Sequence, residues 1–178
     1  MNHANKPENL SHFHFNARSL GKNKHKLVDF FLMTEVNPTS MAISETKLKP
    51  NFIVNIDIPG FNLVHNPSQT NAGGVGLFIN SKLTYQLRND LNLQNVSCES
   101  LFTETPTSSG KPFIVGVIYR YPTHAFPPFQ DEFIKLVTPL QNTNCKYLIG
   151  GDFNSNLLKY REQSNIMVMV YCFIWLSQ

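Results

Sequence analysis

Short apolar runs separated by turn-forming residues are the feature that most constrains the fold of this chain. Six runs rich in Val, Ile, Leu, Phe and Tyr are typical of β-strands; they span residues 10–15, 41–44, 74–79, 96–103, 113–119 and 147–149. Asn, Pro, Gly and Ser cluster between them at 66–74 and at 105–111. The second cluster predicts the tip of a hairpin, so we expect the strands on either side of it to be antiparallel.

Two further segments have the periodicity of amphipathic helices. Residues 24–36 place Leu27, Phe30, Phe31 and Thr34 on one side, and residues 128–137 align Phe129, Phe133, Leu136 and Val137. Pro127 and Pro128 suit the start of the second helix. Strands in pairs with helices between some of them favour an α/β fold built as a layered sandwich, rather than a purely parallel sheet or an all-β barrel.

The composition is that of one globular domain. The chain has 178 residues, 42% of them hydrophobic and 15% charged, which is enough apolar material to bury a core. The net charge of +3 permits contact with a polyanion. Three cysteines without paired spacing predict a reducing, intracellular compartment; they are Cys98, Cys145 and Cys172. The apolar run 166–176 is shorter than the roughly 20 residues of a membrane span, so we expect no membrane anchor.

Four of the apolar runs end in a polar residue whose side chain has metal or phosphate chemistry. These residues are Asn16, Glu45, Tyr119 and Asp152. If their strands are neighbours that run the same way, the strand ends meet on one rim and bring an amide, two carboxylates and a phenol together. Oxygen ligands of this kind suit Mg²⁺, which keeps most of its waters and commonly needs only one or two protein carboxylates. Glu45 is the obvious ligand.

The segment Asp152-Phe153-Asn154 places two polar side chains two residues apart. In an extended stretch both would point the same way, while Phe153 turns into the core. Asp152 would then orient or deprotonate a water, and Asn154 would hold a water or a phosphate oxygen.

Each of these residues also has a purely structural interpretation. A lone Glu45 at a strand end is a solvated turn residue, and the segment 152–154 by itself is a turn with an Asx cap. Asn16 alone caps a turn, and Tyr119 is a half-buried strand tyrosine with a wet hydroxyl. The glycines of segment 73–76 lack the spacing of a phosphate-binding loop, and close packing before a strand explains them better.

Taken together, five ordered motifs resemble the endonuclease/exonuclease/phosphatase superfamily. They are Asn16-Ala17-Arg18-Ser19-Leu20, Ser44-Glu45-Thr46-Lys47-Leu48, Gly73-Gly74-Val75-Gly76-Leu77-Phe78-Ile79, Tyr119-Arg120-Tyr121-Pro122 and Gly150-Gly151-Asp152-Phe153-Asn154. The first, second and fourth look most like the apurinic-type endonucleases of LINE-like non-LTR retrotransposons. The match covers residues 10–158, and five ordered blocks are far more specific than any one of them.

The resemblance implies a DNase I-like fold, a two-sheet β-sandwich flanked by helices, and hydrolysis of a DNA phosphodiester. It also implies a Mg²⁺ held by Glu45 with Asn16 close by. Asp152 would prepare the attacking water, Asn154 would position the water or the phosphate, and Tyr119 would donate a hydrogen bond to a phosphoryl oxygen. A full-length element would add a reverse transcriptase domain, and a functional protein would act in the nucleus.

Arg120 is a candidate for contact with the DNA backbone, because a guanidinium suits phosphate geometry. The alternative is an ordinary surface arginine.

The later motifs of the family, an Asp in the second half and a terminal Ser-Asp-His, have no counterpart in this sequence, whose six histidines all precede Asp152. In such enzymes the histidine meets the scissile phosphate and the aspartate orients it. We therefore expect residues 1–158 to be a partial domain, incomplete at the C-terminus, with weak or no activity. Residues 159–178 would be a divergent or read-through tail. His12 and His14 share a face of the first strand, which indicates packing or solvent contact.

Two other functions stay open on the sequence. One is a non-catalytic remnant that binds nucleic acid or protein, which salt-dependent DNA retention without cleavage would support. The other is a phosphatase of the same fold acting on phospholipid or inositol phosphates, which fold alone does not exclude.

Overall fold

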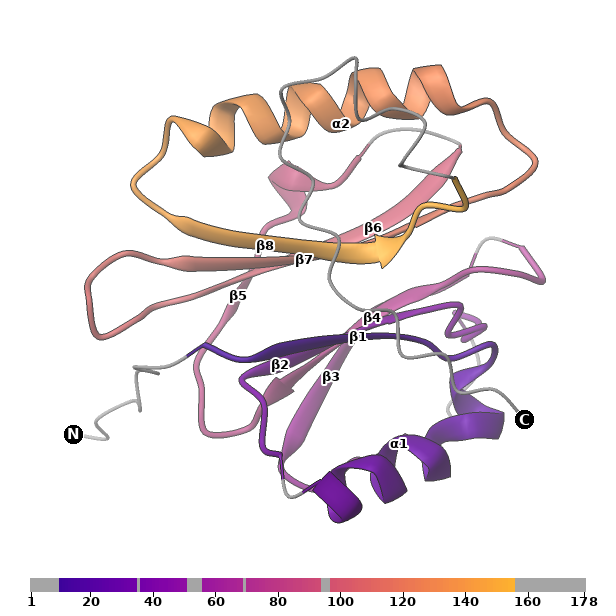
Figure 1. Cartoon of the computed structure of the whole chain (residues 1–178), viewed down its shortest axis with the longest axis vertical. Helices are drawn as coiled ribbons and strands as arrows, with labels where there is room; N and C mark the ends of the chain where they lie inside the picture. The colour runs from indigo at the N-terminus through magenta and orange to yellow at the C-terminus, as the bar shows by residue number, and fades with distance from the viewer. Residues whose placement is uncertain (1–9, 35, 51–55, 69, 94–96, 156–178) are drawn as a thin grey trace.

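Two four-stranded sheets stack face to face, and each carries one α-helix on its outer face (Figure 1). The computed structural model describes residues 10–34, 36–50, 56–68, 70–93 and 97–155. The predictions for the tail at 159–178, for the apolar run 166–176 and for Cys172 lie outside these residues. The expected two-sheet sandwich flanked by helices is confirmed.

The first sheet has the strand order β1-β2-β4-β3, in which β1 is parallel to β2 and the other pairs are antiparallel. Its elements are β1 (His12–Asn16), α1 (Leu20–Thr34), β2 (Ser40–Ser44), β3 (Phe61–Asn66) and β4 (Val75–Asn80). Because β1 and β2 are parallel, the chain must cross back between them, and α1 makes that crossing.

The second sheet has the order β5-β6-β7-β8, in which β7 is parallel to β8 and the other pairs are antiparallel. Its elements are β5 (Gln86–Leu87), the short 3₁₀ helix η1 (Asn89–Leu91), β6 (Cys98–Thr105), β7 (Phe113–Arg120), α2 (Phe126–Gln141) and β8 (Lys146–Asp152). The turn between β6 and β7 is the predicted hairpin, and α2 connects the parallel pair β7 and β8.

Alternation along the central strands builds three apolar layers. In β2, Met41 and Ile43 pack with α1, whereas Ala42 faces the space between the sheets. In β7, Val117 faces that same space, whereas Ile118 packs with α2. Central strands buried on both faces read as continuous apolar runs, which is why the sequence shows them clearly.

The structure contains all six predicted strands and adds β3 and β5. The strand β3 is half-buried and polar at several positions, and β5 is two exposed residues long, so neither has an apolar run. Helix α1 begins at Leu20 rather than at Lys24, because its first turn is polar apart from Leu20 and lacks the periodic signal. Neither α1 nor α2 has the length and apolar character that crossing a membrane requires.

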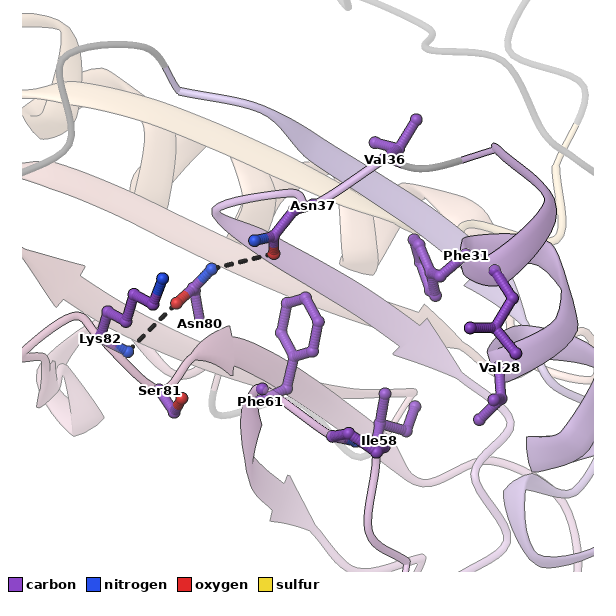
Figure 2. A pocket seen from close by; sticks show the side chains of 12 residues that line it. Val28, Phe31, Val36, Asn37, Ile58, Phe61, Asn80, Ser81 and Lys82 are labelled. Carbon is purple, nitrogen blue, oxygen red and sulfur yellow. Dashed lines mark hydrogen bonds between the residues drawn. The ribbon is translucent and has the colours of Figure 1, made fainter.

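A shallow apolar pocket lies at one end of α1, beside β3 and the last residue of β4 (Figure 2). Phe31 and Phe61 contribute to its lining, and Asn80 closes one side by donating a hydrogen bond to Asn37. In the first sheet Ile79 pairs with Ser40, whereas the first residue of β4 pairs with Ser44. The pocket therefore lies at the opposite end of this sheet from Glu45.

Candidate active site

The ends of four strands form one rim of the sandwich. Asn16 ends β1 and Glu45 directly follows β2, while Asp152 ends β8 and Tyr119 is next to last in β7. In the two parallel pairs, Asn16 lies opposite Ser44 and Tyr119 lies opposite Asp152. Each parallel pair therefore brings its two site residues to the same level of its sheet.

The Asn16 side chain joins the two sheets at this rim. Its Nδ2 donates to Glu45 Oε1 at 2.8 Å and to Asp152 Oδ2 at 2.8 Å. Both carboxylates therefore lie within hydrogen-bonding distance of one nitrogen, although Asn16 and Asp152 are 136 positions apart in the sequence. The structure thus brings together the amide and the two carboxylates that the strand ends predict.

The loops after β1 and β2 run side by side and hold Glu45 in place. The Ala17 N–H donates to the Ser44 carbonyl at 2.9 Å, and the Ser19 N–H donates to the Glu45 carbonyl at 2.9 Å. On the other side, the Gly74 carbonyl accepts from the Thr46 N–H. A Cβ on Gly74 would collide with Thr46 Oγ1, so the packing explanation for this glycine is confirmed.

Left-handed backbone conformations gather at the same rim. Among the described residues, five non-glycine residues have positive φ, and all of them lie in the loops after β1, β2 and β8. They are Arg18, Ser19, Glu45, Lys47 and Asn154. Such conformations cost free energy and persist where the surrounding contacts hold them, which is common at functional sites.

Tyr119 brings a protonated hydroxyl to the two carboxylates. Burial, followed by the negative charges of Glu45 and Asp152, raises the pKa of the Tyr119 hydroxyl to about 12, while a hydrogen bond with Asn154 acts in the opposite direction. The side chain is almost completely buried. Tyr119 is therefore a hydrogen-bond donor at every physiological pH.

The segment from Asp152 to Asn154 makes a turn rather than an extended stretch. The strand β8 ends at Asp152, and Asn154 is left-handed with a φ of 45°. The Asn154 N–H donates to Asp152 Oδ1 at 3.0 Å, which is the Asx turn of the alternative interpretation. Phe153 packs against Phe129 and Phe133 of α2, so the prediction that it turns into the core is confirmed. The prediction that residues 152–154 are extended is wrong, because the pairing of β8 with β7 ends at Asp152 and the chain turns after it.

Arg120 is buried, with 4% of its surface exposed. Both sequence interpretations placed its guanidinium outside, either on DNA or in water. In the structure this group instead donates to four main-chain carbonyls, two of them in the segment that follows Asp152. The predicted contact with the DNA backbone is corrected accordingly, because these donors are already engaged inside the protein.

Glu99 of β6 is a buried carboxylate that sequence reasoning missed. It accepts hydrogen bonds from the Tyr121 hydroxyl and from the Gly74 N–H, and so links β6 to the loop beside Glu45. Its negative charge, after burial and the hydrogen bond itself, raises the pKa of Tyr121. The available signal was a charged residue inside an otherwise buried strand, at a position that pairs with Tyr119.

The donor set of the rim fits a hard divalent cation. Two carboxylates converge on it, and Glu45 keeps about a fifth of its side chain exposed, with Lys47 Nζ 4.0 Å away as a nearby positive charge. Magnesium prefers oxygen ligands and commonly uses one or two protein carboxylates. Within the described part of the chain, no group of three or more His, Cys, Asp or Glu side chains gathers for metal binding.

Asn16 fits this cation as a neighbour of Glu45 more directly than as a ligand. Its Nδ2 faces the carboxylates, and its Oδ1 accepts from the Arg18 N–H at 3.1 Å. An amide nitrogen carrying two protons has no lone pair to offer a metal, so ligation through Asn16 would require the amide to turn over.

Solved structures of low sequence identity share the fold. The catalytic domain of human Nocturnin is 16% identical with a TM-score of 0.59, and the match covers 85% of this chain and 67% of that one. The endonuclease domain of TRAS1, a telomere-specific non-LTR retrotransposon, is 12% identical with a TM-score of 0.59, covering 83% and 60%. TDP2 of D. rerio, complexed with single-strand DNA product, is 10% identical with a TM-score of 0.60, covering 84% and 62%.

These likenesses concern the fold, and the chain spans only about 60% of the length of the last two proteins. Among curated proteins, no sequence matches this chain. Residues 10–161, which include every site residue described above, match the family described as the Endonuclease/Exonuclease/phosphatase family. This chain therefore belongs to the endonuclease/exonuclease/phosphatase family.

Proposed function

We propose that this chain carries a Mg²⁺-dependent phosphodiester hydrolase site that acts on DNA as an endonuclease. The single observation that carries the proposal is the Asn16 side chain, which is hydrogen-bonded at once to Glu45 and to Asp152. This side chain joins a carboxylate from each of the two sheets into one oxygen-rich centre. The name of the family to which the chain belongs refers to enzymes that cleave phosphoesters.

In this proposal Glu45 holds the metal ion and Asn16 fixes the Glu45 carboxylate beside it. When bound, Mg²⁺ supplies positive charge that stabilises the phosphate oxygens as negative charge builds. The hydrogen bond from Asn16 to Glu45 Oε1 restricts the rotation of that carboxylate, which lowers the entropy cost of binding a cation there.

Asp152 is assigned to orient and deprotonate the attacking water. Both of its oxygens are held, Oδ2 by the Asn16 amide and Oδ1 by the Asn154 N–H, and the side chain keeps some exposure. A general base must be fixed within hydrogen-bonding distance of the proton it removes, and two separate donors fix this one.

Tyr119 is assigned to donate a hydrogen bond to a phosphoryl oxygen as the transition state forms. Its raised pKa keeps the hydroxyl protonated, and the Asn154 side chain is its hydrogen-bonding neighbour. A donor that is already in place needs no reorganisation when charge develops, which is the main source of such stabilisation. Asn154 therefore helps to position the phosphate, directly or through Tyr119.

The finer part of the proposal concerns origin. The motif forms of residues 16–20, 44–46 and 119–122 favour an apurinic-type endonuclease of a non-LTR retrotransposon, with a reverse transcriptase as the partner domain and the nucleus as the place of action. The 178 residues contain no Ser-Asp-His motif, so we expect this polypeptide by itself to cleave slowly or not at all.

The test combines metal binding with cleavage. Binding of Mn²⁺, followed by electron paramagnetic resonance, reports on the site without turnover, and nicking of supercoiled plasmid in Mg²⁺ reports on chemistry. We expect Mn²⁺ binding that Glu45→Ala abolishes, and any nicking to fall at least about 100-fold in Glu45→Ala and in Asp152→Ala. The exposed acidic residue Asp131 supplies the matched control, because Asp131→Ala removes a carboxylate of helix α2 that is not one of the strand-end residues of the rim.

Mn²⁺ binding that survives Glu45→Ala would refute the metal assignment. If Glu45→Ala, Asp152→Ala and Asp131→Ala all nicked plasmid as fast as the wild type, the catalytic roles assigned to Glu45 and Asp152 would be refuted. Salt-dependent retention of DNA with no Mn²⁺ binding would favour the interaction remnant instead. Release of phosphate from inositol phosphates, with plasmid left intact, would favour the phosphatase.

A further inference from the structure

Arg120, at the end of β7, has a set of contacts that the proposed chemistry does not use. Its Nε donates to the Phe153 carbonyl at 2.6 Å and its Nη2 to the Asn154 carbonyl at 2.5 Å. Its Nη1 donates to the carbonyls of Tyr121 at 3.1 Å and His124 at 2.6 Å. One side chain therefore ties the segment after β8 to the loop between β7 and α2.

The Asn154 side chain reciprocates this contact. Its Nδ2 donates to the Arg120 carbonyl at 2.7 Å, so the two residues are bonded through both backbone and side chain. The ring of Phe126, at the start of α2, lies 5.6 Å from the guanidinium carbon and covers it. The guanidinium is thus enclosed between two loops and a helix.

This arrangement carries a buried positive charge without a carboxylate partner. None of the ion pairs within the described residues includes Arg120, and its charge faces carbonyl dipoles and the Phe126 ring instead. Burying a charge is costly, and an apolar side chain often serves stability as well or better. A planar fork of five N–H donors is, however, suited to hold four acceptors in fixed directions, which a lysine ammonium is not.

The contacts lead directly to the proposed water-activating carboxylate. Arg120 binds the carbonyls of Phe153 and of Asn154, and Asn154 has a left-handed backbone conformation. The Phe153 carbonyl and the Asn154 N–H belong to one planar peptide group, and this N–H donates to Asp152 Oδ1. Asp152 in turn presents Oδ2 to Asn16.

We propose that Arg120 is a positioning residue for Asp152: its guanidinium fixes the turn after β8 and thereby the direction of the Asp152 carboxylate. The effect of Arg120 on catalysis rests on the proposed function, whereas its effect on the direction of Asp152 rests on the hydrogen bonds alone. A competing explanation is that the core holds the turn, because Phe153 packs against Phe129 and Phe133 at ring-centroid distances of 5.7 and 5.9 Å.

The experiment separates these explanations by nuclear magnetic resonance of the full chain. The Asn16 side-chain NH₂ donates to both carboxylates, so its ¹H and ¹⁵N shifts report on whether Asp152 stays in place. We expect Arg120→Lys to shift these signals and to speed exchange of the Asn154 amide proton, because a lysine cannot reproduce the fork. Arg120→Ala should do the same, and added guanidinium ion, well below denaturing concentration, should partly restore the wild-type signals.

Two controls match this variant. Phe133→Leu removes a ring contact of Phe153 and keeps every Arg120 bond, and Arg88→Lys changes an arginine whose partners are Asp90 and Glu104. Both should leave the Asn16 signals close to wild type. Equal shifts in Phe133→Leu and Arg120→Lys would overturn the proposal and assign the turn to the core. Should Arg120→Ala fail to fold, Arg120→Lys still decides between the two explanations.

The catalytic arm uses plasmid nicking. Where the wild type nicks DNA at a measurable rate, we expect Arg120→Lys to lower kcat about 10- to 100-fold with KM little changed, because the substitution disturbs an outer contact of the site and not a substrate contact. A rise in KM with kcat unchanged would contradict the positioning role. If the wild type neither binds Mn²⁺ nor nicks DNA, the proposed function fails, whereas the resonance measurement still tests the Arg120 contact.

Discussion

At the scale of single residues, the rim depends on polar groups that are buried with their partners. Glu99 accepts from the Tyr121 hydroxyl on one oxygen and from the Gly74 N–H on the other. Removing such an acceptor leaves buried donors without partners, which costs more than the hydrogen bonds themselves contribute. Glu99 therefore stabilises the loop that packs against Thr46, next to Glu45.

We predict that Glu99→Ala lowers the free energy of unfolding by about 2–4 kcal/mol, because two buried donors lose a charged acceptor. Glu99→Gln should cost clearly less, because the remaining carbonyl oxygen still accepts one of the two hydrogen bonds. Urea denaturation followed by far-ultraviolet circular dichroism measures both values.

Glu104 in the same strand provides the control. It is only partly buried and pairs with Arg88 near the surface, where ion pairs contribute about 0–1 kcal/mol. We expect Glu104→Ala to cost about 1 kcal/mol or less. A cost for Glu99→Ala no greater than that for Glu104→Ala would show that the buried acceptor does not hold the loop.

The sequence predicts a residue of this site when its side chain can bind a metal or a phosphate and it also lies at the end of an apolar run. Asn16, Glu45, Tyr119 and Asp152 all follow apolar runs, and the structure gathers them. Arg120 also lies at a strand end, but its side chain is buried in the protein and does not reach the solvent-facing rim. Whether a guanidinium meets solvent or four carbonyls depends on loops that are distant in sequence, so no local pattern reveals it.

At the scale of elements, β7 determines most of the architecture. It lies between β6 and β8, contributes to both apolar layers of its sheet, and carries Tyr119 and Arg120 at its end. Its burial on both faces made it predictable from an apolar run, whereas the exposed two-residue strand β5 had no such signal. The pairing of β7 with β6 requires that the Phe102 ring of β6 fit beside Gly116 of β7.

Gly116 of β7 lies opposite Phe102 of β6, and the Phe102 ring occupies the space where a Gly116 side chain would be. Because Phe102 is fully buried, its ring has no free direction in which to move. We predict that Gly116→Ala lowers the free energy of unfolding by about 1–3 kcal/mol through overpacking. Adding Phe102→Leu should recover part of this loss, which urea denaturation of the single and double variants measures.

Gly21 in α1 serves as the comparison, because no atom lies within van der Waals contact of a Cβ placed there. Gly21→Ala should be neutral or stabilise by up to about 1 kcal/mol, since alanine suits a helix better than glycine. If Gly116→Ala were as harmless as Gly21→Ala, the Phe102 ring would have another position, and the argument from packing would be wrong.

At the scale of the whole molecule, the two sheets meet along β1 and β8 as well as through their apolar faces. His12 and His14 of β1 lie against Gly150 of β8, and the Asn16 amide completes the contact with Asp152. His12 Nδ1 lies 2.8 Å from the Ser40 hydroxyl. The expectation that the two histidines take part in packing is confirmed, but the sequence held no information on which strand they would face.

The partial burial of these histidines makes the stability of the sandwich depend on pH. Desolvation lowers the pKa of His12 to about 3, with a smaller effect from the charge of His14, and lowers the pKa of His14 to about 4. In the unfolded chain both imidazoles titrate near pH 6.5. Between these values the unfolded chain binds protons that the folded protein does not, so the free energy of unfolding decreases as pH falls from about 6.5 toward 4.

We predict an average loss of about 1 kcal/mol per pH unit for each histidine between pH 6.5 and 5, a window in which most carboxylates remain ionised. The slope steepens across this window toward its limit of about 1.4 kcal/mol per pH unit, because the imidazole of the unfolded chain is only half protonated at pH 6.5. Urea denaturation at pH 7, 6 and 5 measures the slope, and the double variant His12→Gln, His14→Gln should flatten it. The exposed residues His25 and His65 give the matched control, because His25→Gln with His65→Gln should keep the wild-type slope. An unchanged slope in the His12, His14 double variant would mean that these imidazoles bind protons as readily in the folded protein as in the unfolded chain, which would contradict their desolvation beside β8.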